Sequence, residues 1–120
     1  EYLLSSKLIS NAPFPINATK TKTTLDLEID NNIAYLDFDL LTFPITIRKW
    51  KNGDSFIPIG MTNKKKVSDF LIDKKVPQSE KDQTWVMLNK NEIIWVIGHR
   101  ISNSYKISQL TENCLQLRLP

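Results

Sequence analysis

Five consecutive apolar residues, Ile93 to Ile97 (IIWVI), constrain the fold of this chain more than any other feature. A short run without a polar position predicts a β-strand that is covered on both faces, in the centre of a sheet. A second apolar segment, residues 84–88, precedes it, and the residues between them, 89–92 (NKNE), are turn formers. The two segments therefore predict a β-hairpin with a four-residue connection.

Weaker patterns predict the other elements. Apolar and polar residues alternate within 19–30, which is typical of a half-buried strand, and the turn 30–32 joins this segment to a strand over 33–38 as a second hairpin. Further predicted elements are a strand over 45–50, a helix over 65–74, a helical turn over 78–83 and closing strands over 105–110 and 114–119. Together they predict a β-rich α+β domain with one or two short helices.

The length of 120 residues, with 41% apolar content, suits one self-folding domain. Residues 1–18 lack sustained periodicity and carry Pro13 and Pro15, so we interpret them as a linker or docking arm and residues 19–120 as the domain. No apolar run is long enough to cross a membrane. The single cysteine, Cys114, is expected in the core and favours a reducing compartment, typical of a cytoplasmic protein.

Positive charge is concentrated in the middle of the chain. Residues 45–82 carry nine Lys and Arg against five Asp and Glu, whereas residues 1–44 carry three against six. A small net charge of +3 with local clustering favours a partner that is touched at one patch, such as a structured RNA. The alternative is a basic face that only contacts solvent.

The segment 48–75 (RKWKNGDSFIPIGMTNKKKVSDFLIDKK) concentrates these charges around a turn-rich loop. We expect Trp50 in the core, and Lys49 and Lys51 exposed beside it. Four residues are assigned to the shape of the loop rather than to contacts: Gly53, Asp54, Pro58 and Gly60.

The lysine triplet Lys64 to Lys66 is predicted to open the helix over 65–74. Cations at a helix N-terminus oppose the helix dipole, so stability does not explain them, whereas an external phosphate does. The alternative places the lysines ahead of the helix, in solvent. Asp69 and Asp73 are expected to pair with these lysines or to fix the helix.

Catalytic and metal-binding patterns are sparse. One histidine, His99, and one cysteine cannot form a His/Cys metal set, and three isolated glycines do not form a phosphate-binding glycine-rich loop. A hydrolase using Asp54 and His99 is the least favoured of the functions considered. By itself the chain does not resemble an enzyme, and no cofactor or metal is expected in it.

Three motifs resemble the C-terminal domain of bacterial tRNA(Ile)-lysidine synthetases. They are R-x-W-x-x-G-D-x-F-x-P-x-G-M from Arg48 to Met61, K-K-x-S-D-F from Lys65 to Phe70, and I-x-W-V-x-G-x-R-I from Ile93 to Ile101. The family usually has glycine at the position of Asn63, and asparagine tolerates positive φ better than most residues. Ser104 stands where the family often has a longer polar residue.

The resemblance implies a three-layer domain built on an unusual β-sandwich, similar to one in the phenylalanyl-tRNA synthetase β-subunit. It implies that the domain binds the acceptor stem of the tRNA(Ile) with a CAU anticodon, while an N-terminal domain absent here uses ATP to join lysine to the wobble cytidine. Expected partners also include the other domains of the enzyme and a possible second copy in a homodimer. The alternative is a structural module in which the loop 53–61 docks onto the rest of the enzyme.

Eight residues are predicted to contact RNA phosphates: the cations within the spans of the matching motifs, the lysine triplet, and Lys75, which follows the second motif. They are Arg48, Lys49, Lys51, Lys64, Lys65, Lys66, Lys75 and Arg100.

Overall fold

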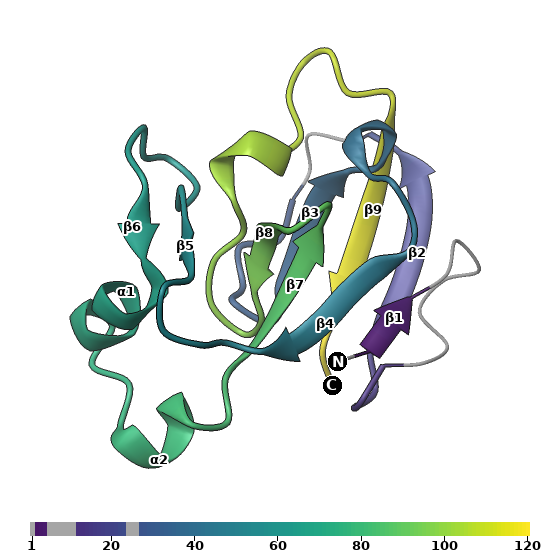
Figure 1. The fold of residues 1–120 in the computed structure, drawn as a ribbon. Helices are drawn as coiled ribbons and strands as arrows, with labels where there is room; N and C mark the ends of the chain where they lie inside the picture. Colours follow the sequence, from purple (N-terminus) through teal and green to yellow (C-terminus); the bar gives the residue numbers. More distant parts are fainter. Residues whose placement is uncertain (1, 5–11, 24–26) are drawn as a thin grey trace.

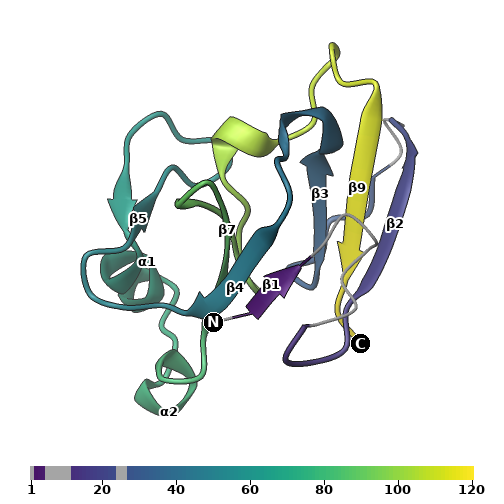
Figure 2. The ribbon, with the colours of Figure 1, turned by 45° about the vertical axis from the view of Figure 1, so that its right-hand side comes forward.

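The computed structural model describes residues 2–4, 12–23 and 27–120, arranged in three layers (Figures 1 and 2). The middle layer is an antiparallel sheet in the order β1 (Tyr2–Leu4), β4 (Ile45–Lys49), β7 (Trp85–Asn89) and β8 (Glu92–Val96). One outer layer is a sheet in the order β2 (Asn17–Lys22), β9 (Asn113–Arg118) and β3 (Ile33–Asp37). The other contains β5 (Ser55–Phe56), β6 (Lys65–Lys66) and α1 (Val67–Asp73), with α2 (Gln78–Lys81) beyond it.

Each face of the middle sheet covers its own hydrophobic core. On β7, Val86 and Leu88 pack toward α1, whereas Met87 packs toward the β2–β9–β3 sheet. A bulge between Met87 and Leu88 adds Ile94 to β8, and both Ile94 and Trp95 belong to the core between the two sheets. Residues on β8 thus enter both cores, which confirms the predicted two-sided burial.

The predicted central position of this strand is wrong, because β8 ends the order of its sheet. Backbone groups of the segment 101–102 nevertheless bind the outer edge of β8. The Ser102 N–H donates to the Ile94 carbonyl at 2.8 Å, and Trp95 pairs with Ile101 in an isolated bridge. The turn before β8 is also tighter than predicted, since Lys90 and Asn91 both take positive φ (50° and 65°) in a two-residue connection.

The predicted hairpin between 19–30 and 33–38 does not form. Both β2 and β3 pair with β9, so that Asn17 and Ile33 share Arg118 as their register partner. The C-terminal strand β9 is therefore the middle strand of this sheet. Three of its residues are buried: Cys114, Leu115 and Leu117. Residues 24–26 of the predicted strand lie outside the described residues, and 27–30 form no strand.

Much of the predicted arm contacts the domain. β1 pairs with β4, Phe14 packs edge-on against Trp85 at 5.9 Å between ring centroids, and β2 begins at Asn17. The predicted boundary after residue 18 therefore falls inside a strand. Residues 1 and 5–11 of the arm lie outside the described residues.

Two further elements differ from prediction. The helix begins at Val67 rather than residue 65, because Lys65 and Lys66 pair with β5. The closing strand predicted over 105–110 is absent: Asn103–Tyr105 forms a 3₁₀ turn (η2), and residues 108–111 are held by a local hydrogen bond from the Ser108 N–H to the Thr111 hydroxyl. A second 3₁₀ turn, Phe38–Leu40 (η1), follows β3. No helix in the described ranges is long and apolar enough to cross a membrane.

Candidate nucleic-acid interface

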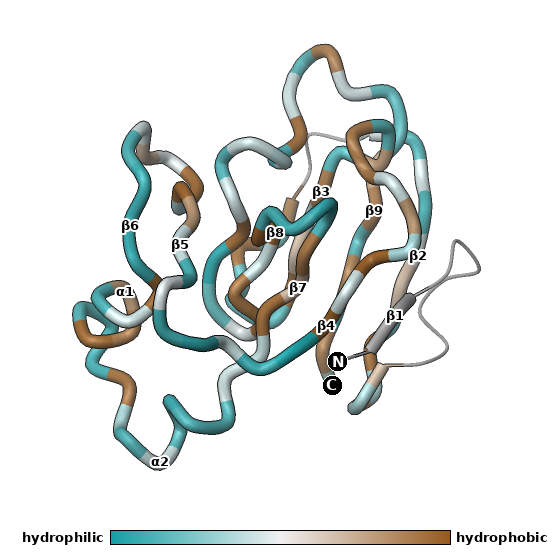
Figure 3. Tube along the Cα trace, viewed as in Figure 1, coloured by the Kyte–Doolittle hydropathy of each residue, from teal (hydrophilic) through white to brown (hydrophobic). Residues whose placement is uncertain are grey.

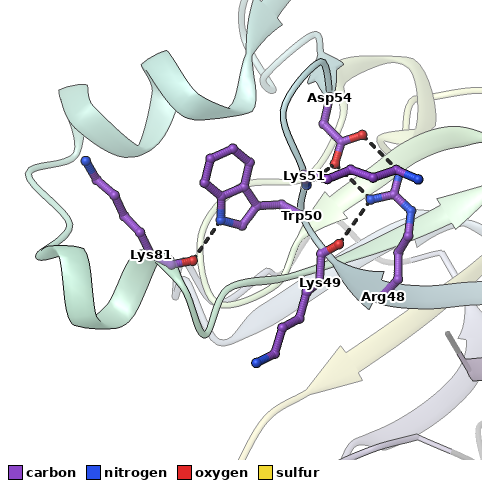
Figure 4. A network of polar contacts seen from close by, with 6 residues as sticks. All are labelled: Arg48, Lys49, Trp50, Lys51, Asp54 and Lys81. Carbon is purple, nitrogen blue, oxygen red and sulfur yellow. Dashed lines mark hydrogen bonds and ion pairs between the residues drawn. The ribbon is translucent and has the colours of Figure 1, made fainter.

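A network around Asp54 fixes the turn after β4 (Figure 4). The Arg48 guanidinium donates to both Asp54 carboxylate oxygens, at 2.8 and 2.9 Å, and the Lys51 N–H donates to the same carboxylate at 2.8 Å. Burial alone would raise the Asp54 pKa, but the hydrogen bonds from Arg48 and Lys51 and their positive charges hold this pKa below its usual value. Gly53 has φ +95° beside open space, so the backbone conformation requires glycine there.

The residues between Arg48 and the turn contact α2 and the residues that follow it. The Trp50 indole donates to the Lys81 carbonyl at 2.7 Å and packs against the core under α1 (Figure 4). Lys49 is exposed, but its ammonium donates to the Gln83 side-chain oxygen at 3.3 Å and lies 5.7 Å from the Trp85 ring.

The loop from β5 to β6 is attached to the domain by its apolar residues. Phe56 is buried and packs edge-on against Phe70, with centroids 5.2 Å apart. Pro58 is buried and pairs with Ser102, and the Gly60 N–H donates to the Asn103 side chain at 3.1 Å, with φ +85° at Gly60.

The lysine triplet stands directly before α1 and not inside it: Lys65 and Lys66 form β6, Lys64 precedes that strand, and the helix begins two residues later than predicted. Lys66 is the N-cap residue of α1, and the first helical N–H, that of Val67, donates to the Asp54 carbonyl at 2.9 Å. The phosphate site predicted from free helix amides therefore loses its first donor. Lys65 pairs with Asp73, whereas Lys64 and Lys66 are exposed. Figure 3 shows β6 as a hydrophilic stretch of the chain.

Lys75 and Arg100 each follow the end of an element. Lys75 takes φ 55° after α1 and donates its N–H to the Ile72 carbonyl at 2.8 Å, while the Val76 N–H donates to Leu71 at 3.1 Å. These bonds form a Schellman motif, with lysine at the position that usually holds glycine. Arg100 is exposed after Gly98, and its carbonyl accepts from Val96.

The structure thus divides the eight predicted contact residues into two groups. The side chains of Arg48, Lys49 and Lys65 bind other residues of the chain. The other five of the eight have no side-chain hydrogen bond or ion pair within the described residues: Lys51, Lys64, Lys66, Lys75 and Arg100.

His99 is half-buried, and its ring lies edge-on to Phe70 at 6.1 Å. Burial lowers the His99 pKa and the Lys74 charge lowers it further, while Glu80 opposes them. No hydrogen bond joins His99 to Asp54 among the described residues, whose side chains also include no group of His, Cys, Asp or Glu arranged to hold a metal ion.

Sequence reasoning did not select two exposed basic residues near these groups, Lys74 and Lys106. The Lys74 ammonium lies 5.7 Å from the Phe70 ring, which also packs against His99. The Lys106 backbone forms an isolated β-bridge with Leu36. The helical period did place the Lys74 ammonium in water, but nothing in the local sequence indicates that Lys106 lies near Arg100.

A family model described as the TilS substrate C-terminal domain matches residues 45–119. The tRNA(Ile)-lysidine synthase of Parabacteroides distasonis is 42% identical over 111 residues, which cover 91% of this chain and 25% of the relative. The same enzyme of Bacteroides thetaiotaomicron is 38% identical over 108 residues, covering 88% and 25%. The chain therefore spans about a quarter of the length of these curated relatives.

Solved structures agree with the expected fold. A crystal structure of the TilS C-terminal domain has a TM-score of 0.75 at 21% identity, covering 97% of this chain and 87% of that one. An N-terminal fragment of the phenylalanyl-tRNA synthetase β-subunit from Pyrococcus horikoshii has a TM-score of 0.59 at 15% identity, covering 71% and 27%. By its matched residues and its relatives, the chain belongs to the C-terminal domain family of the tRNA(Ile)-lysidine synthases.

Proposed function

We propose that this chain is the tRNA-binding module of a tRNA(Ile)-lysidine synthase and contacts the acceptor stem of the tRNA(Ile) that has a CAU anticodon. The observation that carries the proposal is that five of the eight predicted contact residues are exposed and have no side-chain hydrogen bond or ion pair in the described part of the chain: Lys51, Lys64, Lys66, Lys75 and Arg100. All belong to the segment from β4 to the turn after α1 or to the turn after β8.

Unpaired lysines on a surface gain little for the fold, whereas each can neutralise a phosphate and release a counterion. A structured RNA helix is recognised mostly through its backbone and shape, which suits separate cations on a rigid layer. Lys66 is held on β6, Lys64 stands directly before that strand, and Lys75 is held by the helix end, so their positions do not depend on a mobile tail.

On this proposal the chain supplies affinity for tRNA and no catalytic residue. Binding of ATP and the transfer of lysine belong to the part of the enzyme outside this chain, which is about three quarters of its relatives. The module would work in the cytoplasm beside those domains, as one copy or as part of a homodimer.

The contacts of the loop disfavour the alternative, docking of 53–61 onto another domain. Phe56 and Pro58 are buried inside this chain, and Met61 is the residue of the loop that remains a large exposed hydrophobic, at 44%. Docking through one flexible side chain would bury too little apolar surface to hold two domains together.

The proposal is tested by fluorescence anisotropy of the chain with an acceptor-stem minihelix of tRNA(Ile) across a salt series. The log of the binding constant should fall by about 0.7 to 0.9 per log unit of salt for each phosphate contact. The variant Lys64→Ala/Lys66→Ala should bind about tenfold more weakly.

The matched control is Lys20→Ala/Lys22→Ala, which removes two lysines at the same spacing from β2 in the opposite layer (Figure 2). It should bind like the natural chain. Equal losses in both variants would show that only net charge matters, and absence of binding at low salt would reject an RNA-binding role for the isolated chain.

A further inference from the structure

An apolar groove of about 370 Å³ lies between residues 27–31 and the segment 99–107. Its apolar lining comes from aliphatic side chains and the Tyr35 ring: Leu27, Ile29, Ile33, Tyr35, Ile59, Ile101 and Ile107. The Ile29 side chain is fully exposed, although an isoleucine normally avoids water. The Tyr35 hydroxyl accepts from the Glu28 N–H at 3.1 Å, which fixes the ring against the wall formed by residues 27–31.

Four charged residues stand at the rim of the groove: Glu28, Asp30, Arg100 and Lys106. Glu28 already pairs with Arg118 at 3.4 Å, and the Asp30 carboxylate accepts from the Asn32 N–H at 2.8 Å. Arg100 and Lys106 have no side-chain partner among the residues that the structure describes. The groove therefore offers an apolar interior beside two available cations.

The groove also adjoins the cations of the candidate interface. His99 lines the groove and packs against Phe70, whose ring also lies 5.7 Å from the Lys74 ammonium. Lys75 is the next residue after Lys74 in the sequence. A ligand running from the end of α1 toward Arg100 would thus stay beside positive charge until it reached the groove.

We propose that this groove binds one unpaired nucleotide of the RNA, with the base against the aliphatic wall and Tyr35 and a neighbouring phosphate at Arg100 and Lys106. This inference rests on the proposed RNA-binding function. The flat face of a base can pack on apolar side chains while its polar edges stay in water, and the adjacent phosphate supplies an anion, so a nucleotide fits both properties of the site; stacking on a ring tolerates any base. An apolar protein segment would match the walls but would leave both cations unpaired.

The inference is tested by comparing two RNA hairpins in anisotropy: an acceptor-stem minihelix with a blunt end, and the same hairpin with a short unpaired 3′ extension. The extension should raise affinity about tenfold, as one stacked base with its phosphate would. Ile29→Ser and Lys106→Gln should remove this gain and leave binding of the blunt hairpin unchanged. Leu110→Ser, another exposed apolar position outside the groove, should keep the gain.

A second measurement keeps the test independent of folding defects. In methyl NMR spectra of the natural chain, the signals of Ile29 and Ile107 should shift with the extended hairpin and not with the blunt one.

Equal affinity for the two hairpins, with unmoved methyl signals, would overturn the inference and leave the proposed function intact. Absence of binding to either hairpin would instead reject the proposed function, and the inference with it. Methyl shifts that appear only when the other domains of a full-length relative are added would identify the groove as a protein interface.

Discussion

The Arg48 guanidinium and the Asp54 carboxylate, six residues apart, meet through two parallel hydrogen bonds, with only 15% and 10% of their side chains exposed. Arg48 also donates to the Lys49 carbonyl at 3.1 Å, so the pair closes the turn between β4 and β5 from within. The arginine and aspartate of the motif R-x-W-x-x-G-D therefore have a structural explanation that needs no ligand.

Arg48→Lys tests this assignment. Lysine keeps the charge but cannot form the two parallel bonds, so the variant should lose about 1–3 kcal/mol of unfolding free energy. Urea denaturation followed by tryptophan fluorescence measures the loss, while the affinity of the folded variant for the minihelix should be unchanged. A fully stable variant that binds RNA weakly would instead make Arg48 an RNA contact.

Asn89 joins three segments from a buried position. Its side-chain oxygen accepts from the Thr42 N–H at 2.8 Å, and its amide donates to the Tyr105 hydroxyl at 3.1 Å. Asn89→Ala leaves both partners without a bond and should cost about 2–4 kcal/mol of unfolding free energy. Tyr105→Phe removes one bond and should cost about 1 kcal/mol in the same denaturation assay. Equal costs for the two variants would contradict the three-segment role of Asn89.

The sequence predicted the local elements better than their pairing. The run at Ile93 to Ile97 correctly indicated burial on both faces, since apolar periodicity reports the environment of a strand. Local sequence patterns could not show that β9 lies between β2 and β3, because the paired residues are far apart in the sequence.

The same limit applies to the candidate site. Lys64 to Lys66 were selected for their charge alone. The strand of Lys65 and Lys66 depends on pairing with β5, and two consecutive residues show no periodicity. Gly53 and Asp54 were assigned to the loop from turn chemistry, which acts over a few residues. The groove beside Arg100 was not foreseen, because it joins segments about seventy residues apart.

His99 gives the stability a pH dependence. Burial lowers its pKa in the folded chain below the ordinary value of 6.5, so the unfolded chain binds the proton first. Stability should therefore be full above about pH 6.5 and decrease as the pH falls from there toward the folded pKa. Urea midpoints at several pH values should show this decrease. His99→Gln should remove it, and Glu80→Gln, which removes the charge that raises this pKa, should extend it further into acid.

Lys75 and Lys90 both hold positive φ, 55° and 50°, but only Lys75 belongs to the proposed interface. Glycine removes the steric cost of this conformation, so Lys75→Gly and Lys90→Gly should each raise the unfolding free energy by about 1 kcal/mol in urea denaturation. Each substitution also removes one positive charge. RNA affinity should separate them: Lys75→Gly should bind the minihelix severalfold more weakly, because a phosphate contact is lost, whereas Lys90→Gly should bind like the natural chain. Stabilisation of both variants with equal RNA affinity would show that Lys75 makes no contact, and that its strained conformation needs another explanation.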